Sequence, residues 1–341
     1  MRRRLDPHPR RTALPVKLSR HLLARVALAA APALLAAPLA AQSPAPVSLF
    51  AYDRAAPLEL RDSVLGTEDG VAIHAVSFAS PKGGRATGRL FVPAGRGPFA
   101  GVVLAHGMPG NAEAFTGRGV FIARHGAVVI AIDAPWARRA GPPLVFTPAD
   151  SVEQVQLIVD LQRAVDVLVS RRDVDANRLA YVGRSYGGAT GALFAGVERR
   201  LKTYVLAVAD GGLVAHSTGP GAGDDDHPPF DEISVDGWKR WLAAMRPIEP
   251  ILFVARAAPA SIFFQSAMRD QAVSREDAEA LQAAATGPKE VKWYDTPHPL
   301  DARAYVDQLA WLAKTVGTTP PSAADEAGPR IPPPPGPPPA P

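Results

Sequence analysis

The sequence predicts an α/β protein built on a mostly parallel sheet with helices on both faces. Short apolar runs typical of strands alternate with longer stretches of helical periodicity. Two of the runs, residues 100–105 and 127–132, are continuously apolar, which is typical of strands buried on both faces. Strands that alternate with helices pair in parallel through right-handed crossovers. We therefore expect about eight strands, most of them parallel.

The elements follow one another without an internal repeat. Residues 71–79 and 86–92 alternate apolar and polar positions around a Pro-Lys-Gly-Gly turn, which predicts an antiparallel pair. The further expected strands are residues 100–105, 127–132, 179–182, 203–208, 260–265 and 290–294. The expected helices are residues 114–125, 148–170, 189–197, 275–285 and 300–316.

The predicted domain covers residues 66–318. Residues 43–65 form a polar, Pro-containing approach to it, and residues 211–250 interrupt the strand and helix rhythm, as expected of a cap insertion. Residues 320–341 contain eleven prolines. Because such a composition has little to bury, we expect residues 319–341 to be a disordered Pro-rich tail.

Residues 1–42 have the layout of a secretory signal peptide. Basic residues precede an apolar run of 16 residues, from Val26 to Ala41, which ends in small residues. The run is short and contains two prolines, so a cleaved signal is favoured over an uncleaved membrane anchor. The sequence therefore predicts cleavage near Ala41 and a periplasmic or secreted protein, with no membrane association after cleavage.

The charge distribution counts against nucleic-acid binding. The formal charge is +4, but the leader holds eight of the 37 Lys and Arg residues and one of the 33 acidic residues, leaving 29 against 32 in residues 43–341. The basicity that a phosphate-binding surface would use lies in the leader. The chain has no cysteine, which excludes disulfides, thiolate metal sites and a cysteine nucleophile.

The strongest chemical signal is the segment Gly183-Arg184-Ser185-Tyr186-Gly187-Gly188, which lies between an expected strand and an expected helix. A G-x-S-x-G pattern in that context predicts a nucleophilic serine in a tight turn. Neighbouring backbone can approach such a turn only where the residues two before and two after the serine lack a Cβ. Gly183 and Gly187 meet this requirement, so Ser185 is the expected nucleophile.

A serine hydroxyl needs a base to accept its proton, and the base needs an acid to orient it. His298 follows the last expected strand, and Asp270 follows the strand before it, so both fall at the edge of the sheet where Ser185 lies. We expect His298 as base and Asp270 as acid. Asp210 is the reserve candidate for the acid, and Asp295 is expected to be structural.

The oxyanion formed on attack requires two fixed N–H donors. The backbone of Tyr186, the residue after the nucleophile, is the first expected donor. The second is the backbone of Met108, in the His106-Gly107-Met108 turn that follows strand 100–105. We expect His106 itself to hydrogen-bond the loop rather than to act on substrate.

Residues 66–316 resemble the α/β-hydrolase superfamily, and most closely its dienelactone-hydrolase-like and acetyl-xylan-esterase-like bacterial members. The resemblance rests on four segments in sequence order: AHGMPG, GRSYGG, MRDQAV and WYDTPHPL. It implies the α/β-hydrolase fold, and the order Ser185, Asp270, His298 is that of the superfamily. Dienelactone hydrolases proper use cysteine where this chain has Ser185, which counts against lactone specificity. Prolyl-oligopeptidase relatives share GxSYGG but usually carry a large N-terminal domain.

Aromatic residues are candidates for substrate contact. Trp136 follows strand 127–132, and the expected cap insertion contains Phe230, Trp238, Trp241 and Met245. Insertions at this position commonly roof the pocket in the superfamily, which favours Trp238 and Trp241 as substrate-binding residues, and Trp136 is expected to line the same cavity. Packing of the insertion onto the body explains its aromatic residues equally well. Residues 224–227 (DDDH) are expected to be a solvated loop and not a metal site.

The predicted function is hydrolysis of small-molecule carboxylic esters through an acyl-enzyme, with no metal or organic cofactor. A serine peptidase of the prolyl-oligopeptidase-like type is the alternative, because it would use the same machinery. A non-catalytic hydrolase-like binding protein is disfavoured by the complete set of Ser185, Asp270 and His298. The sequence carries no signal for an oligomeric state.

Overall fold

The computed structural model describes residues 43–218 and 223–331. Within these residues nine strands form one sheet in the order β1-β2-β3-β5-β4-β6-β7-β8-β9. The strands are β1 (Arg61–Glu68), β2 (Val71–Ala79), β3 (Arg85–Pro93), β4 (Phe99–Ala105), β5 (Ala127–Ile132), β6 (Val174–Arg184), β7 (Thr203–Ala207), β8 (Ser261–Ala267) and β9 (Lys289–Tyr294). The helices are α1 (Thr116–Ala123), α2 (Ala149–Ser170), α3 (Tyr186–Val197), α4 (Leu213–Thr218), α5 (Val235–Met245), α6 (Arg275–Ala284) and α7 (Ala302–Val316).

The sheet is parallel from β5 to β9 and antiparallel from β1 through β3 to β5. This agrees with the predicted mostly parallel sheet. Strand β1 lies within the segments expected as a polar approach and the start of the domain. Seven of its eight residues are exposed, so no burial pattern marks it, and it is recognised by its backbone pairing with β2.

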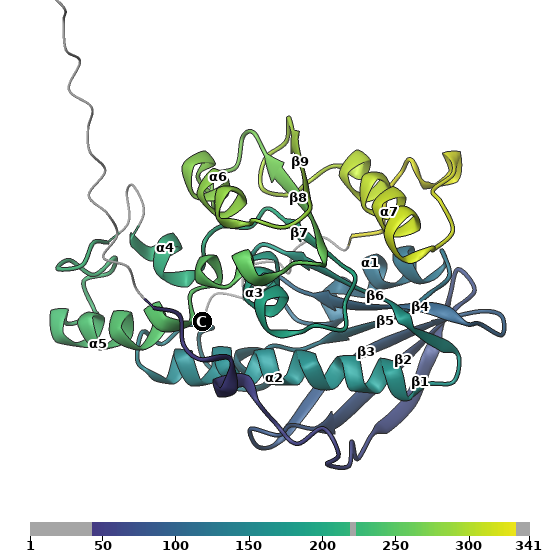
Figure 1. The fold of residues 1–341 in the computed structure, drawn as a ribbon, viewed down its shortest axis with the longest axis horizontal. Coiled ribbons are helices and arrows are strands. Elements are labelled where there is room, and N and C mark those ends of the chain that lie inside the picture. The colour runs from purple at the N-terminus through teal and green to yellow at the C-terminus, as the bar shows by residue number, and fades with distance from the viewer. Residues whose placement is uncertain (1–42, 219–222, 332–341) are drawn as a thin grey trace, which may run out of the picture. The chain divides into compact units, whose positions relative to one another are not determined.

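The inner strands are buried on both faces because consecutive residues enter different cores. In β4, Val103 packs in the cluster that includes residues of α2 and α3. Its neighbours Val102 and Leu104 pack in the cluster that includes residues of α1 and α7. Figure 1 shows α2 lying along one face of the sheet, with α4 and α5 beyond one end of it. The predicted covering of both faces by helices is confirmed.

Two element boundaries differ from the prediction in a way that shapes the site. Strand β6 runs from Val174 to Arg184, and α3 begins at Tyr186, three residues before the expected start of the helix. A single residue, Ser185, therefore joins strand to helix. Helix α1 is shorter than expected, because a 3-10 turn (Glu113–Phe115) replaces the first part of the predicted helix.

Residues 319–331 differ from the predicted disordered tail. Residues Ala323–Asp325 form a 3-10 turn, and the Asp325 side chain is buried against α1, where it pairs with Arg124 and lies 3.1 Å from Nε2 of His125. The prediction fails for residues 319–331 because one buried carboxylate with two basic partners holds them in place, although their sequence has little apolar pattern. Residues 332–341 and the predicted signal peptide, residues 1–42, lie outside the described residues.

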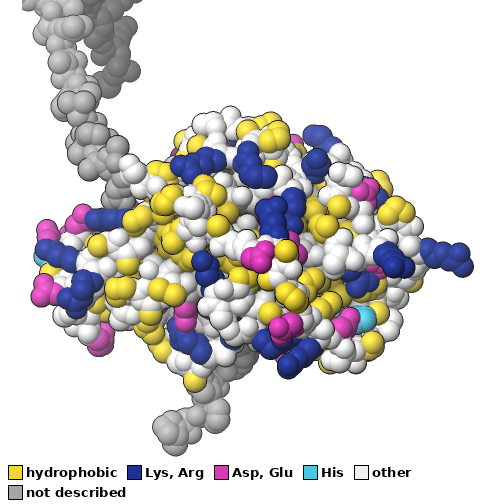
Figure 2. Space-filling model, turned by 60° about the horizontal axis from the view of Figure 1, so that its bottom comes forward, with side chains coloured by type: hydrophobic (Ala, Val, Ile, Leu, Met, Phe, Trp, Pro, Cys, Tyr) yellow, Lys and Arg dark blue, Asp and Glu magenta, His cyan; other side chains and the backbone are white. Residues whose placement is uncertain are grey.

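The surface carries charges of both signs. On the face shown in Figure 2, Lys and Arg side chains lie among Asp and Glu side chains. This mixture agrees with the near balance of 29 basic and 32 acidic residues in residues 43–341. Among the residues that the structure describes, no helix combines the length and the apolar character needed to span a membrane.

Candidate active site

Ser185 occupies a strained turn at the carboxyl end of β6. Its backbone has φ 55° and ψ −124°, a conformation that L-residues rarely adopt. The turn is held from the neighbouring strand, because the Ser185 N–H donates to the carbonyl of Ala207 at 2.8 Å. The side chain is thereby presented at the edge of the sheet, ahead of the first turn of α3.

Close backbone packing explains the glycines on either side of the serine. A Cβ on Gly183 would overlap the carbonyl of Gly187, and a Cβ on Gly187 would lie 2.5 Å from the carbonyl oxygen of Ala105. Gly183 therefore allows the turn between β6 and α3 to close, and Gly187 allows it to fit against the end of β4.

The structure brings the three predicted catalytic side chains together. Oγ of Ser185 lies 3.0 Å from Nε2 of His298, and Nδ1 of His298 lies 2.9 and 2.8 Å from the two carboxylate oxygens of Asp270. Asp270 comes from the loop after β8, and His298 from the loop between β9 and α7. Serine, imidazole and carboxylate thus form a continuous chain of hydrogen bonds.

Backbone hydrogen bonds hold the two loops against each other. The N–H of Met268 donates to the carbonyl of Tyr294 at 2.8 Å, and the N–H of Arg269 donates to the carbonyl of Thr296 at 3.0 Å. Asp270 follows directly on this contact, so its position relative to His298 is set by the main chain.

Asp270 is an ionised hydrogen-bond acceptor. Burial raises its pKa, but the hydrogen bond with His298 and the backbone N–H groups of Val273 and Ala272 outweigh this effect, and the pKa lies below its usual value. A carboxylate in this state accepts the Nδ1 proton of His298. Nε2 is then left without a proton and can accept one from Ser185; this tautomer follows from the hydrogen-bond pattern.

Met108 and Tyr186, whose backbone N–H groups are the predicted oxyanion donors, lie beside Ser185. Tyr186 is the first residue of α3, and Met108 follows Gly107, whose added Cβ would lie 3.1 Å from Cβ of Ser185. Within the described residues neither the Met108 nor the Tyr186 N–H donates a hydrogen bond to another protein group. Both residues line the cavity that contains Ser185, which supports their predicted role as oxyanion donors.

His106 has the structural position expected for it. Nδ1 lies 2.9 Å from the carbonyl of Gly107, and Nε2 accepts a hydrogen bond from the N–H of Ala134 at 3.1 Å. Burial lowers its pKa. Asp295 pairs with Arg269 at 2.7 Å on the surface and does not reach His298.

Arg184 is a further residue of the site that the sequence did not predict. The residue lies between Gly183 and the nucleophile, and its guanidinium donates to the carbonyl of His298 at 3.3 Å. Desolvation by burial lowers its pKa. The side chain therefore ties the loop of the base directly to the turn of the nucleophile.

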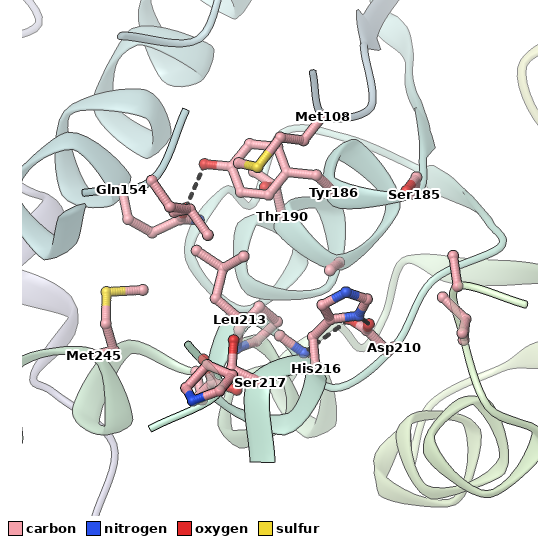
Figure 3. A pocket seen from close by; sticks show the side chains of 18 of the residues that line it. Met108, Gln154, Ser185, Tyr186, Thr190, Asp210, Leu213, His216, Ser217 and Met245 are labelled. Atoms are coloured by element: carbon pink, nitrogen blue, oxygen red, sulfur yellow. Dashed lines mark hydrogen bonds and ion pairs between the residues drawn. The ribbon is translucent and has the colours of Figure 1, made fainter. Parts of the chain in front are cut away.

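A largely apolar cavity of about 550 Å³ opens beside Ser185 and His298. Figure 3 shows Met108, Tyr186 and Ser185 on one side and Leu213, His216 and Asp210 on the other. The remaining lining side chains include Leu144, Phe146, Gln154, Thr190, Ser217, Phe230, Met245, Ile248, Glu249 and Val273.

None of the three tryptophans predicted to contact substrate lines this cavity. Trp238 and Trp241 are fully buried and stack on each other with ring centroids 4.9 Å apart, and Trp136 packs edge-on against Tyr186. The alternative interpretation, packing of the insertion onto the body, describes Trp238 and Trp241, and the Trp241 indole N–H donates to Asp150 of α2 at 2.8 Å. Phe230 and Met245 do line the cavity, together with Phe146, which the sequence analysis did not consider.

Asp210, the reserve candidate for the acid, lies in the same cavity but pairs with a different histidine. Its Oδ2 lies 2.9 Å from Nδ1 of His216, and its Oδ1 accepts the N–H of Gly212 at 3.1 Å. The sequence analysis placed Asp210 at the correct edge of the sheet but did not consider His216 as its partner. A histidine six residues after a carboxylate at a strand end was the available signal.

The side chains of the acidic loop pair with one another and with nearby basic residues. Asp224 bonds His227 with both groups exposed. In residues 43–218 and 223–331 no cluster of three or more His, Cys, Asp or Glu side chains is placed to hold a metal ion.

Strand order and site together define the fold. A mostly parallel sheet, with a serine between β6 and α3 and its acid and base on the loops after β8 and β9, is the α/β-hydrolase arrangement. The chain has the α/β-hydrolase fold, as the four motifs predict.

Solved structures with this fold include two acetyl xylan esterases. The one from Paenibacillus sp. R4 is 20% identical over 76% of this chain and 89% of its own, with a TM-score of 0.63. Acetyl xylan esterase 1 from Thermoanaerobacterium sp. JW/SL YS485 is 14% identical over 79% and 94%, with a TM-score of 0.61. A candidate dienelactone hydrolase from Klebsiella pneumoniae subsp. pneumoniae MGH 78578 is 19% identical over 71% and 99%, with a TM-score of 0.50. No protein-family model and no curated protein sequence matches the chain.

Proposed function

We propose that this protein hydrolyses carboxylic esters through an acyl-enzyme on Ser185. The observation that carries the proposal is the hydrogen-bonded chain from Oγ of Ser185 through His298 to Asp270, with distances of 3.0 and 2.8 Å. A hydroxyl within hydrogen-bonding distance of an oriented imidazole is the arrangement needed to form a serine nucleophile at neutral pH.

The reaction has two matched halves. Oγ of Ser185 attacks the ester carbonyl while Nε2 of His298 takes its proton, and the oxyanion binds the N–H groups of Met108 and Tyr186. The intermediate then breaks the bond to the alcohol oxygen, which receives the proton from Nε2. A water molecule repeats the sequence on the acyl-enzyme and releases the carboxylic acid and free Ser185.

The cavity supports an ester as substrate. Its volume of about 550 Å³ and its largely apolar lining, with Phe146, Phe230 and Met245, suit a small acyl or alcohol group. The structurally similar proteins named above include esterases, which adds support at the level of the fold.

The decisive experiment is a substrate panel on the purified protein without its leader. We expect hydrolysis of p-nitrophenyl esters of short acids, slower or no hydrolysis of peptide p-nitroanilides, and loss of at least about 10⁴-fold in kcat for Ser185→Ala. Ser217→Ala is the matched control, because Ser217 lines the same cavity but the serine that hydrogen-bonds His298 is Ser185. Faster cleavage of peptides than of esters would favour the peptidase alternative.

We also infer that the protein is exported. The support is the leader alone: basic residues followed by the apolar run from Val26 to Ala41. Expression of the full chain in a bacterium should yield a mature periplasmic or secreted protein that begins near Gln42. A cytoplasmic product that keeps residues 1–42 would refute this inference.

A further inference from the structure

The catalytic cavity contains a second histidine and aspartate pair. Asp210 follows β7, and His216 lies on α4, with Oδ2 and Nδ1 2.9 Å apart. Figure 3 shows this pair across the cavity from Ser185 and Tyr186. The triad does not use it, because His298 is bonded to Asp270 and Ser185.

The pair is built so that one nitrogen faces the cavity. The Asp210 side chain is only 11% exposed and is satisfied by His216 and the N–H of Gly212, whereas the His216 side chain is 47% exposed. Within residues 43–218 and 223–331, Nε2 of His216 has no hydrogen-bond partner. Since Nδ1 is held by Asp210, the exposed edge of the ring presents Nε2 to the cavity.

A buried carboxyl group anchors the segment that carries His216. Glu249 accepts the N–H groups of Val214 and Ala215, at 3.0 and 3.3 Å, at the start of α4. This support fixes the position of His216 on the wall. The cavity that His216 lines also contains apolar side chains, among them those of Leu213, Phe230 and Ile248.

The chemistry of the wall selects an uncharged partner. The hydrogen bond that Nδ1 of His216 donates to Asp210 raises the pKa of His216, which favours the protonated ring. A hydroxyl group can accept from the protonated nitrogen and donate to the neutral one. The carboxyl groups of Asp210, Asp270 and Asp277 lie near enough to His216 to act on its charge, and they oppose an anionic partner.

We propose that Nε2 of His216 binds a hydroxyl group of the substrate at a distance from the ester bond. The inference rests on the proposed ester hydrolysis and extends it to specificity: the preferred substrates are esters with a hydroxyl group several bonds from the carbonyl carbon. Asp210 acts as the positioning residue for His216.

Two pairs of esters test this, one for each side of the ester bond. The acyl pair is p-nitrophenyl hexanoate and p-nitrophenyl 6-hydroxyhexanoate, and the alcohol pair is butyl acetate and 4-hydroxybutyl acetate. The quantity measured is the ratio of kcat/KM for the hydroxylated ester to that for the plain ester. We expect the wild type to prefer the hydroxylated ester about tenfold in one pair, the value of one hydrogen bond made only by that substrate.

The variants then assign the preference to the residue. His216→Leu removes both ring nitrogens and should bring the ratio to about one, chiefly by raising KM for the hydroxylated ester. His216→Gln keeps a polar group near the position of Nε2 and should retain part of the preference. His227→Leu is the control, because His227 also pairs with an aspartate, Asp224, but does not line the cavity.

The outcomes separate this inference from the proposed function. A wild type that hydrolyses esters without preference in either pair overturns the inference and leaves the proposed function standing. The same holds if His216→Leu keeps the wild-type ratio. A wild type that hydrolyses none of the four esters and does not react with a fluorophosphonate overturns the proposed function, and the inference with it.

Discussion

Two carboxyl groups at the cavity have the same number of backbone donors and opposite electrostatic states. Asp270 accepts the N–H groups of Ala272 and Val273, and Glu249 accepts those of Val214 and Ala215. The pKa of Asp270 lies below its usual value, whereas burial raises the pKa of Glu249 to about 8.

The partners of the two groups explain the difference. Asp270 also binds an imidazole, that of His298, which stabilises the carboxylate. Glu249 is fully desolvated, and the nearby Asp210 raises its pKa further. Backbone donors alone therefore do not keep a buried carboxyl ionised. The difference supports the proposed role of Asp270 in stabilising charge on His298, whereas Glu249 supports the cavity wall.

The largest expected effect is on the orientation of the base. Asp270→Asn should lower kcat/KM for p-nitrophenyl acetate about 10³–10⁴-fold, because an amide cannot hold the Nδ1–H tautomer of His298. In Asp210→Asn the loss of kcat/KM should be smaller by a factor of at least about 100, since Asp210 bonds His216 and not His298. Initial rates on both purified variants decide, and a greater loss in Asp210→Asn would contradict the assignment.

A second prediction concerns the pH dependence of stability. Glu249 holds its proton in the folded state up to about pH 8 but releases it near pH 4.3 when unfolded. Its contribution to the free energy of unfolding is therefore complete below about pH 4 and is lost as the pH rises towards 8, with a slope of up to about 1.4 kcal/mol per pH unit.

Glu249→Gln should remove this slope. Urea unfolding between pH 5.5 and 8.5 should show the stability of the wild type falling relative to that of the variant as the pH rises. Glu232→Gln is the control, because water solvates that exposed carboxyl group in the folded and unfolded protein. Parallel pH profiles for the wild type and Glu249→Gln would show that Glu249 is ionised in the folded protein.

The smallest expected effect is on the apolar wall. Phe230 lines the cavity and is 54% exposed, so Phe230→Ala should cost little stability and lower kcat/KM for p-nitrophenyl hexanoate relative to the acetate several-fold. Trp238, fully buried behind the wall, gives the contrast. Trp238→Ala should destabilise the protein by about 3–5 kcal/mol, measured by urea unfolding. An unchanged chain-length preference in Phe230→Ala would remove Phe230 from the binding surface.

The sequence carries strong signals where geometry demands particular residue types. Gly183 and Gly187 are required by the backbone contacts at the nucleophile, and Asp270 and His298 follow strands whose ends must meet at one edge. The interior strands could be predicted because they are apolar on both faces. These constraints are local in sequence or follow from strand order, so they can be read without coordinates.

Features set by tertiary packing were not predictable in this way. Trp238 and Trp241 were expected at the substrate, because composition does not say which face of α5 points inward. Strand β1 has no burial pattern, and Asp325 anchors its segment through partners 200 residues away. The His216 and Asp210 pair was missed because Asp210 was considered only as a partner for His298.

The central claim is that Ser185 becomes acylated with the help of His298. Intact-mass and peptide analysis after treatment with a fluorophosphonate tests it most directly. We predict one adduct per chain, located on Ser185, and no adduct in Ser185→Ala. Stoichiometric labelling that persists in Ser185→Ala, or labelling of another residue in the wild type, would contradict the claim.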